Sequence, residues 1–321
     1  MNEIHGLGVR KVSLNKFEIC NAVIELGSLT RAGESLGLTQ SAVSHAISSL
    51  ENEWGFSLLS RGRTGISLTS NGERMLKYMK EMLRWNEQMK QEIAQINGFE
   101  VGTVRIGTFT SVSTLWLPGM IEEFSTEYPS IEVRLQEGNY HEIEYWIASG
   151  VIDFGFVSLP VSESLEIIPL HQDRMLCILP DNHPLHGANG IEYQQIENES
   201  FIMPKSGCDN DVRRILQRNH VKPKIKFELE DDYAIIEMVR KGLGISILPE
   251  MLLSNLRNEV CAVSFHDTPS RTLGIAAHSI KSLSPAAKKF IACTKSWLNH
   301  QVYSTNDSQS FNGDLAPYET K

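Results

Sequence analysis

The sequence has few cysteines and no long hydrophobic run. Its five cysteines among 321 residues are widely spaced and form no CxxC pair, which argues against a disulfide framework and a zinc site. No apolar stretch approaches the ~18 residues that a membrane-spanning helix needs, and residues 1–14 lack the apolar segment of a signal peptide. We therefore expect a cytoplasmic protein that binds no membrane, metal or other cofactor.

Signatures of catalysis are also missing. The motifs GxSxG, HExxH, GxGxxG and the Walker A loop are absent, so no enzyme is expected. The length favours two or three domains. Net charge is −9, but residues 1–97 hold 11 basic and 10 acidic residues, whereas residues 98–321 hold 19 and 29. The acidity therefore belongs to the second part, and charge alone neither identifies nor excludes a DNA-binding part.

Three short helical patterns follow one another from residue 14 to residue 54. In each of them apolar residues recur at helical spacing. Only Gly37 and Leu38 separate the second pattern from the third, and so tight a turn is typical of a helix-turn-helix. The small residues Ala32 and Gly33 would let the two helices approach closely. We expect a compact helical domain at the N-terminus.

The third helical pattern begins at Thr39, a good N-cap, and its polar face has no acidic residue before Glu51. Short neutral donors and acceptors at the start of a helix suit base edges in the major groove. The alternative is an ordinary solvated surface, although Ser is a poorer helix former than the Lys and Glu that usually cover one. The face consists of Gln40, Ser41, Ser44, His45, Ser48 and Ser49.

A short basic hairpin is predicted next. Residues 58–60 and 66–68 are typical of strands, and residues 62–65 would turn between them. Arg61 and Arg63 on this hairpin would form a wing that reaches phosphate or the minor groove. A solvated turn is the alternative.

Residues 14–72 resemble the winged helix-turn-helix of LysR-type transcriptional regulators. The string GSLTRAGESLGLTQSAVSHAISSLE, residues 27–51, carries the resemblance, and Arg61, the Leu68-Thr69 pair and Gly72 continue it. It implies that Thr30 and Arg31 contact the DNA backbone. It implies base reading by Gln40, Ser41, Ser44 and His45.

This sequence departs from the family pattern in the third helix. Ser41 stands where the family usually has Pro, and His45 and Ser48 or Ser49 stand where it has basic residues. Fewer cations release fewer counterions, so we expect weaker and less salt-sensitive DNA binding per site.

Residues 71–97 form a long helical pattern with an uninterrupted heptad seam, whose members are spaced 4, 3, 4, 3, 4 and 3. A polar Asn86 at an a position would cost stability and select the register. The resemblance implies a linker helix that dimerises the DNA-binding domains; packing on its own domain is the alternative. The predicted dimerisation residues are Met75, Met79, Met82, Asn86, Met89, Ile93 and Ile96.

From residue 101 onward strands and helices alternate, which indicates an α/β domain with mainly parallel sheets. Two similar βαβ patterns, residues 131–154 and 225–248, indicate two lobes. The resemblance implies a two-lobed effector-binding domain similar to periplasmic solute-binding proteins, with the first lobe about 101–170 plus 276–300. The predicted organisation is a DNA-binding domain (1–70), a linker helix (71–98), an effector domain (99–300) and a disordered tail (301–321).

Two helix starts at the carboxyl ends of strands would hold an anion, Thr110-Ser111 in one lobe and Lys205-Ser206-Gly207 in the other. Simple capping is the alternative. We expect a small anionic effector, a carboxylate or an inorganic anion. The candidate effector-binding residues are Thr110, Ser111, Asn139, Ser158, Lys205, Ser206, Gly207, Asp231 and Gly244.

Together these patterns predict a ligand-responsive transcriptional regulator. It would bind a double-stranded DNA operator as a homodimer or homotetramer and respond to a small molecule, with RNA polymerase as a further contact. The alternative is a cytoplasmic small-molecule receptor or redox sensor that acts through the α/β domain, where Cys208 raises the redox reading. Activation and repression both remain open.

Overall fold

The computed structural model describes residues 13–62, 65–205, 207–254 and 260–305. The predicted site residues Arg63 and Ser206 lie outside the described residues, as does the expected tail from residue 306 onward. The chain divides into two compact units at Gly98, apart from residues 149–151, which group with the first unit. Among the described residues, no helix combines the length and the apolar character needed to span a membrane.

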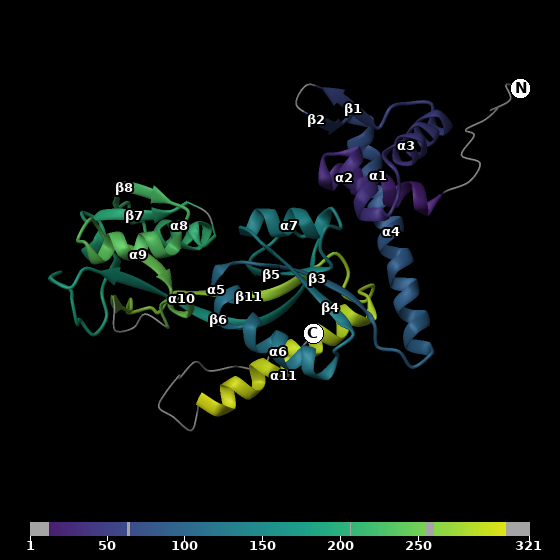
Figure 1. The fold of residues 1–321 in the computed structure, drawn as a ribbon. Helices are drawn as coiled ribbons and strands as arrows, with labels where there is room; N and C mark the ends of the chain where they lie inside the picture. Colours follow the sequence, from purple (N-terminus) through teal and green to yellow (C-terminus); the bar gives the residue numbers. More distant parts are fainter. Residues whose placement is uncertain (1–12, 63–64, 206, 255–259, 306–321) are drawn as a thin grey trace, which may run out of the picture. The chain divides into compact units, whose positions relative to one another are not determined.

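The first unit is a winged helix-turn-helix followed by one long helix (Figure 1). Each predicted element of this unit is confirmed to within two residues. The elements are α1 (Leu14–Leu26), α2 (Leu29–Leu36), α3 (Gln40–Trp54), β1 (Leu59–Gly62), β2 (Gly65–Leu68) and α4 (Ser70–Ile96).

Small residues and a side-chain cap build the turn between α2 and α3. Gly37 has a φ of +66°, in the left-handed region that glycine adopts without strain. Thr39 Oγ1 accepts a hydrogen bond from the N–H of Ala42 at 3.2 Å, as expected of an N-cap. A Cβ atom added to Gly33 would lie 2.7 Å from the carbonyl oxygen of Leu38, so only glycine allows this approach.

The apolar side of α3 lies in the core of the first unit, which leaves its polar side to solvent. The wing is attached to the same helix, because Glu51 Oε1 accepts hydrogen bonds from the N–H groups of Leu58 (2.6 Å) and Leu59 (3.1 Å). The core includes Phe17, Cys20, Val23, Val43, Ile47, Leu50, Leu58 and Met79.

The second unit contains two α/β lobes. Lobe one comprises β3 (Gly102–Thr108), α5 (Thr110–Leu115), α6 (Leu117–Glu127), β4 (Ile131–Glu137), α7 (Tyr140–Ala148), β5 (Phe154–Leu159) and α11 (Pro285–Thr305). Lobe two comprises η1 (Tyr193–Ile196), β7 (Ser200–Pro204), α8 (Asp209–Arg218), β8 (Lys224–Leu229), α9 (Asp232–Arg240), β9 (Ser246–Pro249), α10 (Glu250–Leu253) and β10 (Cys261–Val263). In lobe one, α7 covers one face of the sheet and α6 and α11 cover the other (Figure 1).

Two antiparallel strands connect the lobes, β6 (Glu166–Leu179) and β11 (Ser270–Ala277). The first part of β6 pairs with β11 in the sheet of lobe one, and its last residues pair with β9 and β10 in lobe two. The prediction of mainly parallel sheets is right for the pairs β3–β4, β3–β5 and β7–β8. The prediction is wrong for β6 and β11, which pair antiparallel. The chain leaves lobe one along β6 and returns to it along the neighbouring strand β11, so the two strands run in opposite directions.

One further boundary differs from the prediction. The segment expected to be disordered from residue 301 begins inside a helix, because α11 continues to Thr305.

We expect Gly33→Ala to destabilise the first unit by about 1–3 kcal/mol, because the new methyl group meets a backbone carbonyl that cannot move without opening the turn. Urea unfolding of the full chain, followed through the helical signal, measures the loss. Glu34→Ala is the control: this residue is exposed on the same helix, and its effect should stay within about 0.5 kcal/mol. Equal stabilities of the two variants would contradict the close packing.

Candidate functional site

The residues predicted to bind DNA lie on the surface of α2 and α3. Thr30, Arg31, Gln40, Ser41 and His45 are exposed, and Ser44 is half-buried. Among the described residues, the Arg31 guanidinium donates only a long hydrogen bond, 3.5 Å, to the carbonyl oxygen of Leu26. Its positive charge therefore remains available to a phosphate.

The polar face of α3 that is open to DNA does not extend to Ser49. Lys16 Nζ donates hydrogen bonds to Ser49 Oγ (3.0 Å) and to Glu53 (3.2 Å), so Ser49 serves the contact between α1 and α3. On the wing, Arg61 lies in β1, opposite Ile66 of β2. The start of α3 and the wing remain as the candidate DNA-binding surface.

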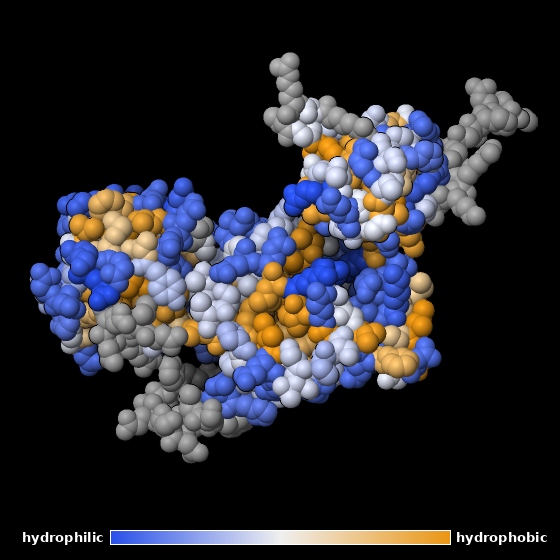
Figure 2. Space-filling model, in the orientation of Figure 1, coloured by the Kyte–Doolittle hydropathy of each residue, from blue (hydrophilic) through white to orange (hydrophobic). Residues whose placement is uncertain are grey.

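The linker helix α4 has an exposed apolar stripe, but it differs from the predicted seam. Met79 is 1% exposed and lies in the core of the first unit, so it is not available for dimerisation, and the half-buried Met75 packs against that core. The exposed stripe gains two aromatic residues that the heptad count omitted, Tyr78 and Trp85. The stripe comprises Tyr78, Met82, Trp85, Met89, Ile93 and Ile96; Figure 2 shows apolar surface over the far end of this helix.

A cavity of about 460 Å³ opens between the two lobes of the second unit. Four predicted effector residues line it, Thr110, Ser111, Asn139 and Gly207. The first three follow strands of lobe one, and Gly207 precedes α8 of lobe two. These four residues therefore lie together where the sequence analysis expected them, at the carboxyl ends of strands in both lobes.

Four other predicted effector residues do not line the cavity, and each has a structural role instead. Lys205 lies near Glu230, with 3.5 Å between Nζ and Oε1. Asp231 caps α9, since its Oδ1 accepts hydrogen bonds from two backbone N–H groups. Gly244 allows close packing, because a Cβ atom there would lie 2.5 Å from the carbonyl oxygen of Ser200.

The fourth, Ser158, joins the lobes. It is buried at the end of β5, and its hydroxyl donates to both carboxylate oxygens of Asp211, at 3.2 and 3.1 Å. Asp211 lies in the first turn of α8 and also pairs with Arg214, which donates to the carbonyl oxygen of Leu159. Burial raises the pKa of Asp211 above its ordinary value. The sequence missed this connection because its partners come from different lobes.

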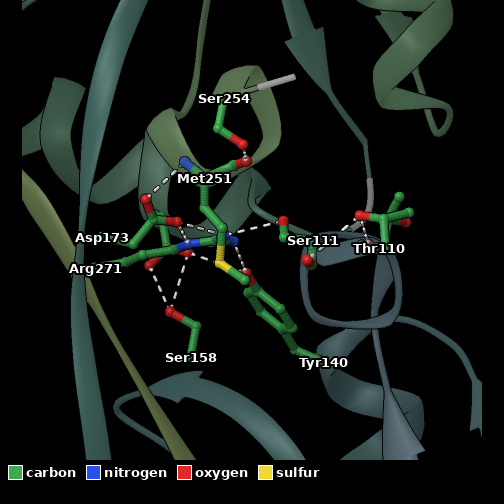
Figure 3. Close-up of polar contacts among 10 residues, drawn as sticks. Thr110, Ser111, Tyr140, Ser158, Asp173, Met251, Ser254 and Arg271 are labelled. Carbon is green, nitrogen blue, oxygen red and sulfur yellow. Dashed lines mark hydrogen bonds and ion pairs between the residues drawn. The ribbon is translucent and has the colours of Figure 1, made fainter. Parts of the chain in front are cut away.

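The centre of the site is a buried guanidinium that the sequence analysis did not single out (Figure 3). Arg271 of β11 faces Asp173 of β6 directly across the strands, and two of its nitrogens donate to Asp173 Oδ2 at 2.7 and 3.0 Å. The guanidinium also donates to the Tyr140 hydroxyl (2.7 Å) and to Ser111 Oγ (3.0 Å). Asp173 Oδ1 accepts a hydrogen bond from the N–H of Met251 at 2.9 Å. The ion pair between Arg271 and Asp173 therefore connects α5 and α7 of lobe one with α10 of lobe two beside the cavity.

Cys208 lines the same cavity, and its thiol is buried. Burial raises the pKa of this thiol well above its ordinary value, whereas reactive cysteines have a lowered pKa. Within the part of the chain that the structure describes, the cysteines are free thiols and no cluster of three metal-ligating side chains occurs.

One signal in the sequence marks Arg271. It is a charged residue at the start of an otherwise apolar strand, and a charge in such a place is rarely buried without a partner. No comparable signal identifies its partner, Asp173, which is far away in the sequence.

Comparisons with known proteins agree with this architecture. Residues 14–73 match the family described as "Bacterial regulatory helix-turn-helix protein, lysR family", and residues 97–299 match "LysR substrate binding domain". The chain is 33% identical over 287 residues to an uncharacterized HTH-type transcriptional regulator, YvbU, of Bacillus subtilis (strain 168), covering 88% of this chain and 98% of that protein.

Solved structures share the fold. A full-length OxyR variant from Pseudomonas aeruginosa has a TM-score of 0.74 at 18% identity, covering 90% of this chain and 95% of the other. CbnR in complex with its target DNA has a TM-score of 0.63 at 19% identity, covering 89% and 100%.

We expect Arg271→Met to destabilise the second unit by about 3–5 kcal/mol, because it leaves the Asp173 carboxylate buried without its counterion. The double variant Arg271→Met/Asp173→Asn removes that uncompensated charge and should lose less than the single one. Urea unfolding of the full chain measures both. A double variant that loses at least as much as the single one would contradict the uncompensated Asp173 charge as the cause of the loss.

Proposed function

Because the chain belongs to the LysR-type transcriptional regulators, which are DNA-binding regulators and not enzymes, we propose that it binds a promoter operator through the start of α3 and the wing. The exposed polar start of α3, held by the Gly33 turn and the Thr39 cap, carries this proposal. The cavity between the lobes would hold the small-molecule effector. From family membership we also propose a homodimer or homotetramer that contacts RNA polymerase on DNA.

Different residues of this surface would supply specificity and affinity. Gln40, Ser44 and His45 present hydrogen-bonding groups of the kind that read base edges, while Arg31 offers a charge that attracts any phosphate. Base reading changes the preference for one sequence, and phosphate contact changes the affinity for all DNA.

We expect Gln40→Ala and Ser44→Ala to reduce discrimination between operator and random DNA by about 1–3 kcal/mol for each lost good base contact. Arg31→Ala should instead weaken binding to both DNAs about equally. Binding isotherms on an operator selected from genomic fragments, repeated with random DNA of the same length, separate the two effects. Operator preference that is unchanged in both the Gln40 and the Ser44 variant would remove α3 as the reading helix.

The exposed stripe on α4 supports assembly through this helix. Met82, Trp85 and Met89 are each exposed by between 43% and 56%, and side chains of this size are usually covered. The unit's own core takes Met75 and Met79, so the stripe remains for a second copy of the chain.

We expect the full-length double variant Met82→Asp/Met89→Asp to dissociate, because two carboxylates would have to be buried in an apolar contact. Sedimentation of the full chain over a range of concentrations measures the change. Lys90→Asp also introduces a carboxylate on α4, but at an exposed position that points away from the stripe, and it should leave the assembly intact. A wild-type chain that stays monomeric, or a double variant that stays assembled, would exclude the stripe as the interface.

A further inference from the structure

The wall of the effector pocket is acidic. One guanidinium lines it, that of Arg271, against several carboxylates from both lobes. The acidic side chains are Glu137, Glu142, Glu230 and Asp232. The balance of charge in the pocket is therefore the reverse of what an anionic effector needs.

The cationic side chains near these carboxylates, Arg271 and Lys205, already form ion pairs within the protein. Arg271 is buried against Asp173, with 2.7 Å between Nη2 and Oδ2, so its charge is compensated within the protein. Lys205 lies 3.5 Å from Glu230, and both side chains are largely exposed. No ion pair with a described residue compensates Glu137, Glu142 or Asp232. A ligand entering the pocket meets uncompensated negative charge.

Two of the helix starts beside the pocket, those of α7 and α9, have internal acceptors in place of a bound anion, whereas α5 and α8 begin without a side-chain cap. At the start of α7, Glu142 accepts a hydrogen bond from the N–H of Asn139 (2.9 Å), and Asn139 accepts one from the N–H of Glu142 (3.0 Å). At the start of α9, Asp231 Oδ1 accepts from the N–H groups of Tyr233 (2.8 Å) and Ala234 (3.2 Å). Side chains of the protein therefore occupy the positions where these helices would bind an anion.

Asp232 provides an independent observation. Its Oδ1 atom is shielded from solvent and accepts no hydrogen bond from the residues that the structure describes. A buried acceptor without a donor costs free energy, and the cost is larger for a charged group. Burial, only partly offset by Arg271, raises the pKa of Asp232 to about 6, so near neutral pH this carboxylate is mostly charged while its Oδ1 has no donor among the described residues.

We propose that the effector is a small organic cation whose protonated amine or guanidine lies against Asp232. This proposal rests on the proposed function, in which the pocket holds an effector, and it replaces the anion expected from the sequence. A donor on the ligand would satisfy the unpartnered oxygen, and its positive charge would be attracted by Glu137 and Glu142. A bound metal ion is a poorer match, because the described residues form no cluster of three metal ligands.

Three probes of equal chain length and different charge test this class: putrescine, γ-aminobutyrate and succinate, each with four carbons. Thermal unfolding and titration calorimetry of the full-length protein at neutral pH measure their binding. We expect putrescine to bind most tightly, γ-aminobutyrate more weakly and succinate least. Asp232→Asn should weaken putrescine binding about tenfold or more, as expected for the loss of a hydrogen bond between charged groups.

Glu237→Gln is the matched control. It removes the same charge from an exposed position on the same helix, outside the pocket, and should leave the affinity for putrescine unchanged. Thermal unfolding without probes checks that both variants fold. Tightest binding of succinate, no binding of either amine, or equal affinity of putrescine for the wild type and Asp232→Asn would each overturn the proposal. Operator binding by the same wild-type sample, measured without probes, tests the regulator function separately.

Discussion

The buried ion pair between Arg271 and Asp173 determines the geometry on which the pocket between the lobes depends. The two residues are register partners on β11 and β6, at the point where the chain passes between the lobes. Burying two charges costs several kcal/mol per ion unless further hydrogen bonds accompany their attraction. Here Tyr140 and Ser111 accept from the guanidinium, and the N–H of Met251 donates to the carboxylate. Those partners fix α5, α7 and α10 around the crossing, and the pocket floor forms where they meet.

The N-terminal unit was predictable because its signals are local. A glycine in the turn, a threonine cap and a polar helix face lie within a few residues of one another, and the structure confirms the boundaries they predict. The centre of the pocket was not predictable in this way. Arg271 and Asp173 are 98 residues apart, and only the pairing of β6 with β11 brings them together. Likewise, Asp231 and Asp232 are adjacent acids, and only the backbone of α9 decides that the first caps and the second lines the pocket.

The linker helix shows why a periodic pattern identifies a stripe without identifying its partner. The heptad count correctly predicted a long amphipathic helix. It could not show that the winged domain covers Met75 and Met79. Because the first turns of α4 pack against their own unit, the exposed stripe shifts towards Tyr78 and Trp85. Spacing alone cannot distinguish burial within a domain from burial between two copies of it.

The unpartnered carboxylate links the chemistry of the pocket to regulation. A ligand shifts a conformational equilibrium only by the difference in its affinity for the two states. Asp232 belongs to lobe two, whereas Ser111 and Asn139 line the pocket from lobe one, so a ligand that contacts all three binds best in one arrangement of the lobes. The buried hydrogen bonds of Asp211 with Ser158 already hold the lobes together without a ligand. The proposed cation would therefore not need to bring the lobes together. It would stabilise the lobe arrangement that these hydrogen bonds already hold, by compensating the negative charge of Asp232.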